Sequence, residues 1–370
     1  MTKIVIARRG VPLHIPDGIN VHIFALSDEL IAMGHDVYVM SDVFSDIDLV
    51  KKFFAPDNLP YLVSLTDKQS LSKYQTLLVW LNKGQGMLRE ISPDLIIING
   101  AVPLPKDLAA RSCFVSHDLE KRKIMGLDFL RILYKRKTYL MASSIIATCS
   151  ELKDLLSKEL SVDKDKIKVI PTCFDTRKYH YYRFEERENA ILHVGTVFYK
   201  NPKLTIQAFG NLEDLLEHLD LKLYITGDVT EELLNFVNDF KDYIKNRIVF
   251  LGLVDENNFK KLLARVKIVS VPSTYTAPVA SPTAIEALLS GTPVVASYGI
   301  SKDVIIDGIN GFMCPLSPEE FAEKFKRIMS DKNLWERMSS NALITSRDRF
   351  GAHNVAKKYL ELIPLNPIRR

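Results

Sequence analysis

Several features that would quickly assign a chain to a class are scarce in this sequence. Only four cysteines occur in 370 residues, widely separated and without a Cys-x-x-Cys pair. This pattern argues for a reducing compartment and against a disulfide or zinc framework. No stretch contains the roughly 18 uninterrupted apolar residues that a membrane span needs, and no charged leader precedes a long apolar run at the start. We therefore expect a cytoplasmic protein.

An excess of charge of one sign is also missing. The chain has 49 basic and 45 acidic residues, a formal net charge of +4, whereas nucleic-acid-binding domains usually carry a clustered basic face. We expect no nucleic acid among its partners. Low-complexity tracts and short-period repeats are absent too, which leaves ordinary globular domains, and the length fits two of them.

What the sequence does contain is a regular alternation of short runs rich in Ile and Val with longer amphipathic segments. This pattern is typical of parallel strands buried on both faces and of their crossover helices. We expect strands at residues 4–7, 37–41, 95–99, 114–116, 145–148, 168–170, 191–195, 222–226, 248–251, 268–272 and 293–297. We expect helices at residues 20–33, 231–243 and 258–266.

The pattern restarts after a polar, aromatic and charged stretch at residues 176–188, which we interpret as a linker. Two successive units of this kind predict two Rossmann-like domains, whose sheets bind ligands beyond the carboxyl ends of their strands. An NAD-binding domain would carry Gly-x-Gly-x-x-Gly directly after its first strand. Here that position is Arg8-Arg9-Gly10-Val11-Pro12, so a dinucleotide site is not favoured.

The strongest local signal is a helix start in the second half. Ser281 suits an N-cap and Pro282 a first helical turn, so the N–H groups of residues 282–284, with Thr283 and Ala284 among them, predict a phosphate site. Glu286 lies one turn further on, where its carboxylate is placed to grip two vicinal ribose hydroxyls. The alternative is an acid favoured only by the helix dipole, and the local sequence does not separate the two.

Pro272-Ser273 followed by the segment from Ile285 to Ala296 resembles the signature of the retaining glycosyltransferases of family four. Further segments resemble that family's motifs in the family's order: Gly34-His35-Asp36-Val37, Ser116-His117-Asp118, Lys168-Val169-Ile170-Pro171 with Phe174-Asp175, His193-Val194-Gly195 with Lys200-Asn201-Pro202, Ile248–Gly252, and residues 307–312. Residues 335–359 resemble the C-terminal helices that cross back onto the first domain. The resemblance covers nearly the whole chain.

The resemblance implies the GT-B fold, an α/β architecture of two Rossmann-like domains whose parallel sheets face a central cleft. An acceptor-side domain is expected at residues 1–175, completed by a helix at about 350–370, and a donor-binding domain at residues 176–349. The implied activity moves a sugar from a UDP-, GDP- or other nucleoside diphosphate sugar to a glycan, glycolipid or other acceptor in glycan biosynthesis.

In the donor-binding domain, the resemblance implies that Lys200, in the loop after Gly195, binds the donor diphosphate. No metal or other cofactor is expected, so positive groups must neutralise this charge. The alternative for Lys200 is a solvated surface lysine. Leu253 is the first residue of the stretch, residues 253–255, on which the choice of base is expected to depend.

In the first domain, His117 is expected to hydrogen-bond the donor sugar and to position an oxocarbenium-like transition state, with Asp118 beside it. The alternative is a structural histidine at a strand end. Gly18 marks the loop that is expected to approach the donor phosphates.

The chain departs from the family pattern at two donor positions. Thr196 stands where the family usually has an arginine, and Pro278 stands eight positions before Glu286, where the family has its first glutamate. Ser281 or Thr283 is the candidate to contact the sugar in its place. These departures support the hypothesis of a non-catalytic sugar-nucleotide-binding subunit. A further hypothesis, an epimerase or phosphorylase on the same fold, also stays open.

Two charged segments have less specific interpretations. Asp46-Ile47-Asp48 matches the metal-binding Asp-x-Asp of another glycosyltransferase fold, but we interpret it as solvated loop acids. The basic stretch at residues 119–141 either lies on an anionic membrane surface, at the inner face of the membrane and next to a lipid-linked acceptor, or is a packed helix with a solvated face.

Overall fold

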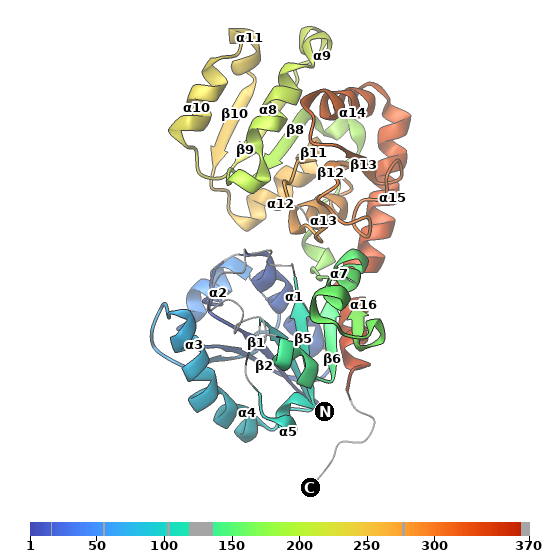
Figure 1. Cartoon of the computed structure of the whole chain (residues 1–370). Helices are drawn as coiled ribbons and strands as arrows, with labels where there is room; N and C mark the ends of the chain where they lie inside the picture. The colour runs from blue at the N-terminus through green and yellow to red at the C-terminus, as the bar shows by residue number, and fades with distance from the viewer. Residues whose placement is uncertain are drawn as a thin grey trace. The chain divides into compact units, whose positions relative to one another are not determined.

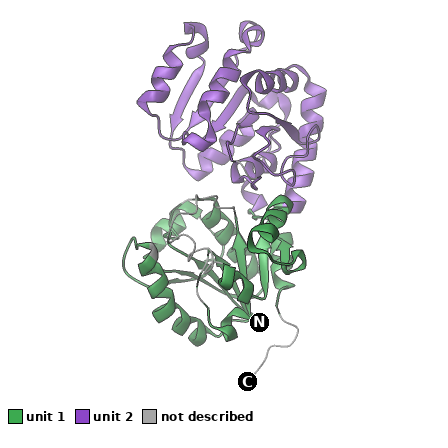
Figure 2. Ribbon diagram, in the orientation of Figure 1, with its two compact units in different colours: residues 1–174, 350–370 green, residues 175–349 purple. Residues whose placement is uncertain are grey.

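The computed structural model describes residues 1–15, 17–54, 56–100, 102, 104–117, 136–275 and 278–363. The chain divides into two compact units, coloured separately in Figure 2. Unit 1 comprises residues 1–174 and 350–370, and unit 2 comprises residues 175–349. Each unit contains one sheet of parallel strands joined by helical connections (Figure 1). The prediction of two Rossmann-like α/β domains is therefore confirmed.

Unit 1 has a seven-stranded sheet in the order β3-β2-β1-β4-β5-β6-β7. Its strands are β1 (Lys3–Arg8), β2 (Asp36–Ser41), β3 (Tyr61–Ser64), β4 (Leu95–Asn99), β5 (Ser112–Ser116), β6 (Ser144–Ala147) and β7 (Ile167–Val169). Its helices include α1 (Gly18–Ala32), α2 (Ile47–Phe54), α3 (Lys73–Val79), α4 (Gln85–Ile91), α5 (Lys106–Ala109), α7 (Ser150–Leu160) and α16 (Ala352–Leu360). The strand order reverses between β1 and β4, where such sheets leave room for a ligand.

Unit 2 has a six-stranded sheet in the order β10-β9-β8-β11-β12-β13. Its strands are β8 (Glu188–Val194), β9 (Lys222–Thr226), β10 (Ile248–Gly252), β11 (Val266–Val271), β12 (Val294–Ser297) and β13 (Gly311–Cys314). Its helices are α8 (Pro202–Gly210), α9 (Glu213–His218), α10 (Glu231–Asn238), α11 (Asp242–Lys245), α12 (Glu256–Arg265), α13 (Pro282–Leu289), α14 (Pro318–Ser330) and α15 (Lys332–Phe350). Short 3-10 turns lie at Thr176–Lys178, Phe184–Glu186 and Phe198–Lys200. The order reverses between β8 and β11.

The returning segment of the chain completes the core of unit 1. Val355, Ala356 and Tyr359 of α16 are buried in the same apolar cluster as the side chains of β1, β4 and α1. The backbone is tied at the point of return, because the N–H of Phe174 donates to the carbonyl of Phe350 at 2.9 Å and the N–H of Ala352 donates back to Phe174 at 3.1 Å. Among the described residues, no helix has both the length and the apolar character needed to cross a membrane.

Three details differ from the elements expected from the sequence. The helix expected at residues 231–243 is interrupted, since α10 ends at Asn238, the N–H of Phe240 closes a turn on Val237, and α11 starts at Asp242. The strands β3 and β13 were not expected. Both lie at the edges of their sheets, and neither is a run rich in Ile and Val, since β3 reads Tyr-Leu-Val-Ser and β13 reads Gly-Phe-Met-Cys.

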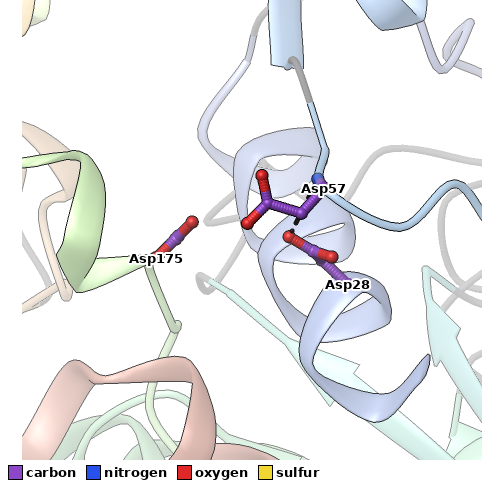
Figure 3. Close-up of side chains that lie close together, drawn as sticks. All are labelled: Asp28, Asp57 and Asp175. Atoms are coloured by element: carbon purple, nitrogen blue, oxygen red, sulfur yellow. Dashed lines mark hydrogen bonds between the residues drawn. The ribbon is translucent and has the colours of Figure 1, made fainter. Parts of the chain in front are cut away.

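Two acidic side chains of unit 1 fix loops by accepting backbone N–H groups. Asp28 on α1 accepts the N–H of Asp57 at 3.3 Å (Figure 3). It also accepts the N–H of Asn58 at 2.8 Å. Asp46, in the expected Asp-x-Asp, accepts the N–H of Asp48 at 2.9 Å and that of Leu49 at the start of α2, so this carboxylate fixes the start of a helix. Asp175, also labelled in Figure 3, opens unit 2 and accepts the N–H of Arg177 at 3.1 Å.

A buried arginine ties the segment before β8 to the rest of unit 2. The Arg187 guanidinium donates to the carbonyls of Tyr182 at 2.9 Å, Val266 at 2.9 Å and Ser290 at 2.8 Å. Cζ of Arg187 lies 4.8 Å from the ring centroid of Trp335. Burial lowers the pKa of Arg187 to about 10, so the group stays charged at neutral pH. One side chain thus satisfies carbonyls from three separate segments.

Replacing this arginine by an apolar side chain of similar length should weaken unit 2. We expect Arg187→Met to lower the free energy of unfolding by about 2–4 kcal/mol, because several buried carbonyls lose their donors. Urea denaturation followed by tryptophan emission measures the change. Arg265→Met is the matched control: Arg265 is largely exposed and paired with Glu188, so its loss should change the free energy by less than about 1 kcal/mol. Equal effects of the two substitutions would contradict the role assigned to Arg187.

Candidate functional site

The strand order of unit 2 reverses between β8 and β11. Beyond the carboxyl ends of these two strands, a lysine lies against the start of α13. Gly195, directly after β8, has a positive φ of 88°, and a Cβ placed there would lie 3.4 Å from Cγ of Lys200. The lysine side chain therefore runs close over the glycine. Its Nζ donates to Oγ1 of Thr283 at 3.4 Å. Gly195, Lys200 and Thr283, expected from the sequence to share a site, lie together.

A chain of hydrogen bonds between buried polar groups ends at the backbone carbonyl of Gly195. Nε2 of His193 donates to the Gly195 carbonyl at 2.9 Å, so Nδ1 accepts the hydroxyl proton of Thr205, also at 2.9 Å. The Thr205 hydroxyl lies 2.8 Å from that of Ser270 on β11. Burial lowers the pKa of His193 to about 3, which keeps the ring neutral. The motif His193-Val194-Gly195 includes the first member of this chain, but nothing in the sequence pointed to Thr205 or Ser270.

The start of α13 has the expected cap but offers fewer N–H groups than expected. Ser281 is the N-cap, and its hydroxyl accepts the N–H of Ala284 at 3.4 Å. Pro282 carries no N–H. Of the three residues 282–284 proposed as phosphate donors, Thr283 thus retains an N–H that neither the cap nor the proline ring removes. Among the described residues, the groups at the start of α13 that are placed to donate to a phosphate include that N–H, the Thr283 hydroxyl and the Lys200 ammonium.

Glu286 is the fifth residue of α13, beyond the first turn in which the helix dipole favours acids. The Tyr179 hydroxyl donates to its Oε1 at 3.0 Å. Burial raises the pKa of Glu286 to about 7, while the Tyr179 hydrogen bond and the charges of Lys260 and Lys200 act in the opposite direction. The helix dipole alone does not account for a carboxylate held in this way.

Lys200 and Glu286 influence each other electrostatically. Burial lowers the pKa of Lys200, and the Glu286 carboxylate opposes this shift. The lysine is not the solvated surface residue that was the alternative interpretation. A cation, an N–H and a carboxylate at one sheet edge are the groups that a phosphate and a pair of vicinal hydroxyls require.

Three other positions that the sequence associates with the nucleotide-sugar site do not join Lys200, Thr283 and Glu286. The Thr196 hydroxyl donates to the carbonyl of Asp228 at 2.6 Å, so it holds the loop after β9 and supplies no charge. Leu253 follows β10 and is 80% exposed, and β9 separates its strand from β8. Pro278 begins the described segment that leads to α13, and Val279 beside it bridges to Ile300.

In unit 1, His117 follows β5 and lies close to Asn99 at the end of β4. Nε2 of His117 is 2.9 Å from Oδ1 of Asn99, which can only accept, so Nε2 carries the proton and Nδ1 is an acceptor. The His117 ring packs edge-on against His22 of α1, with centroids 6.0 Å apart. Burial, and then the nearby His22 and Arg8, hold the pKa of His117 well below its ordinary value.

The loop after β1 is fixed by one ion pair and one hydrogen bond to a carboxylate. Nη2 of Arg8 lies 2.7 Å from Oδ2 of Asp17, and Asp17 caps α1, whose first residue is Gly18. Asp42 accepts the N–H of Gly10 at 2.6 Å. Gly18 therefore lies inside the first turn of a capped helix.

Asp118 and residues 119–135 of the basic stretch lie outside the described residues. At the end of that stretch, Tyr139 is buried and stacks on Phe114 of β5 with ring centroids 5.2 Å apart.

Comparisons with known proteins agree with the two-unit architecture. The family model described as "Glycosyl transferases group 1" matches residues 178–344, and the model described as "Glycosyltransferase Family 4" matches residues 16–178. The uncharacterized glycosyltransferase MJ1607 of Methanocaldococcus jannaschii is 28% identical over 235 residues, which are 58% of this chain and 58% of that protein. The chain thus spans less than two thirds of the length of that relative.

Solved structures share the fold over nearly the whole chain. A glycosyltransferase from Rickettsia africae has a TM-score of 0.75 at 19% identity and covers 99% of both chains. Anabaena Alr3699/HepE, solved in complex with UDP and glucose, has a TM-score of 0.70 at 17% identity and covers 98% of this chain and 99% of its own. These likenesses identify the fold.

Because the pKa of Glu286 is raised, we expect the free energy of unfolding to depend on pH through this residue. A glutamate whose pKa rises from 4.5 to about 7 on folding holds its proton to a higher pH in the folded state, so its contribution is complete below about pH 4.5 and is lost as the pH rises through 7. In Glu286→Gln the side chain at this position cannot ionise. Relative to the native chain this variant should gain about 1–3 kcal/mol of stability between about pH 5 and about pH 8.5, measured by denaturation at both pH values.

Glu217→Gln, which changes an exposed glutamate of α9, is the control and should show no such pH-dependent gain. A pH-independent difference between Glu286→Gln and the native chain would contradict the assigned burial of the Glu286 carboxylate.

Proposed function

Because the chain belongs to the group 1 glycosyltransferases, we propose that it transfers a sugar from a nucleoside diphosphate sugar to a glycan, glycolipid or other acceptor. We propose retention of configuration at the anomeric carbon. The observation that carries the proposal is the meeting of Lys200, Thr283 and Glu286 at the reversal of strand order in unit 2, where sheets of this kind bind ligands.

In this proposal the diphosphate lies at the start of α13. Lys200 offsets its charge and the N–H of Thr283 donates a hydrogen bond to it, and both interactions strengthen as negative charge develops on the leaving phosphate. These protein groups take the place that a metal ion holds in other phosphate sites. Glu286 in its ionised form has two oxygens that accept only, and these suit the two hydroxyls of a ribose.

His117 is proposed to act as a neutral hydrogen-bonding group. Its Nε2–H is committed to Asn99, so its Nδ1 is the atom available to accept a sugar hydroxyl. Since burial keeps the pKa of this ring far below neutrality, it is not expected to take up a proton during the reaction. It orients the sugar while charge develops at the anomeric carbon.

A second candidate function is nucleotide binding without transfer. It is favoured by Thr196, which brings no positive charge to the donor loop and whose hydroxyl is bound to Asp228. The two candidates differ in turnover: both bind a nucleotide, but only a glycosyltransferase releases the diphosphate from its donor sugar.

Nucleotide binding is tested by thermal denaturation in the presence of UDP, GDP, ADP, dTDP or CMP. A ligand at about 100 times its Kd stabilises the folded state by about 2.7 kcal/mol, which for a unit of this size raises the midpoint by about 5–10 °C. We expect one diphosphate to do so and CMP to do less. UDP is the first probe because HepE was solved with it.

The shift should disappear in Lys200→Ala and Glu286→Ala. Lys203→Ala is the matched control, because Lys203 lies three residues further on and pairs on the surface with Glu232, so this variant should bind as the native chain does. Absence of a shift with every nucleotide would overturn the donor site.

Turnover is tested with the donor sugar of the nucleotide that binds. We expect His117→Ala to lower kcat for diphosphate release by about 10- to 100-fold, the effect of one strong hydrogen bond, while the nucleotide-induced thermal shift stays unchanged. His353→Ala, an exposed histidine of α16 paired with Glu29, should keep full activity. Unchanged kcat in His117→Ala would return His117 to a structural role, and absence of turnover in the native chain would favour the binding subunit.

A further inference from the structure

Tyr179 reaches the donor site from a segment that precedes the sheet of unit 2. It directly follows the 3-10 turn Thr176–Lys178, which Asp175 caps by accepting the N–H of Arg177. The same carboxylate pairs with Nε of Arg177 at 2.8 Å. The turn directs the tyrosine inward, since only 7% of Tyr179 is exposed. The side chain is thus held by local hydrogen bonds at one end and by burial at the other.

At its inner end the Tyr179 hydroxyl meets Glu286, with 3.0 Å between the hydroxyl oxygen and Oε1. Burial, followed by the charge of Glu286, raises the pKa of Tyr179 well above its ordinary value, so the phenol keeps its proton and is the donor. An ionised carboxylate has about four acceptor directions. The hydrogen bond occupies one of them at Oε1 and leaves the rest of the group for other donors.

Other charged groups face this pair. Nζ of Lys260 on α12 lies 5.2 Å from the ring centroid of Tyr179 and pairs with Glu256 on the same helix. Lys200 interacts with Glu286 from the loop after β8. Lys260 and Lys200 favour the ionised carboxylate and Glu256 opposes it. Of these neighbours, Tyr179 is the one that the structure joins directly to the Glu286 carboxylate by a hydrogen bond.

We propose that Tyr179 is a positioning residue of the donor site, which orients the Glu286 carboxylate for the ribose hydroxyls through its phenolic hydrogen bond. This inference rests on the proposed function and deepens it, because it assigns the working geometry of Glu286 to a residue that need not contact the ligand. A phenylalanine would fill the same space without the hydrogen bond.

Removal of the hydroxyl has a defined consequence for the pH dependence of binding. The Tyr179 hydrogen bond stabilises the ionised form of Glu286, so its loss makes the carboxylate harder to ionise. In Tyr179→Phe we expect the pH midpoint of diphosphate binding to rise by about one pH unit, which lowers the affinity near pH 7 by about five-fold. The affinity should return at about pH 9, where Glu286 ionises in both proteins.

The probe is UDP, or the diphosphate of the panel that gives the largest thermal shift, and Kd is measured by calorimetry from about pH 6 to about pH 9. Ionisation of the nucleotide's own phosphate is common to both proteins and cancels in the comparison. Tyr224→Phe is the matched control. It removes another Tyr–Glu hydrogen bond of unit 2, 2.6 Å long, to Glu188 at the first residue of β8, and should leave the pH profile unchanged.

Each outcome bears on the inference. A rise in the midpoint in Tyr179→Phe and not in Tyr224→Phe supports it. Equal weakening at every pH indicates a purely structural residue and overturns it. An unchanged profile overturns it too, while nucleotide binding by the native chain keeps the proposed function.

A readout without ligand keeps the inference testable if no nucleotide binds. The pH dependence of unfolding that is due to Glu286, defined by comparison with Glu286→Gln, should shift upward by about one pH unit in Tyr179→Phe. Failure of the panel with this shift present would overturn the donor site alone. Failure of the shift would overturn the coupling of Tyr179 to Glu286.

Discussion

A carboxylate withdrawn from water must be compensated, and much of the candidate donor site of unit 2 follows from this requirement at Glu286. Burial alone would keep the group protonated. The Tyr179 hydroxyl and the two lysines, Lys200 and Lys260, act against burial, and the balance places the pKa of Glu286 at about 7. The carboxylate is therefore close to the point at which a small change in its surroundings decides its charge.

The helix that carries Glu286, α13, is held at both ends. The helix has eight residues, too few to be stable without tertiary contacts. Ser281 caps its first turn, and Arg187 donates to the carbonyl of Ser290 just beyond its last turn. Glu286 lies between these anchors, so its position depends on Arg187 as well as on its direct neighbours. A buried cation beyond the last turn of the helix thereby contributes to the position of Glu286.

The sequence predicted well what depends on local pattern. Runs of Ile and Val located the central strands of both sheets, and the glycine-then-lysine segment and the helix start brought Lys200 and Thr283 to one edge. It failed for contacts between distant residues. Tyr179 and Arg187 lie in a stretch interpreted as a linker, yet each bonds residues about 80 to 107 positions away. No periodicity records such contacts, because they arise only when the sheet has formed.

The two units differ in the kind of chemistry their buried groups allow. The two histidines of unit 1 that meet near the end of its sheet are neutral, since burial lowers the pKa of His22 to about 4 and holds that of His117 well below its ordinary value. They can hydrogen-bond but not exchange protons near neutrality. In unit 2, His193 is likewise neutral, but Lys200 and Glu286 form an ionisable pair beside it. On the protein side, we therefore expect Glu286 to contribute to the dependence of donor binding on pH in the neutral range, whereas His22 and His117 contribute geometry without charge.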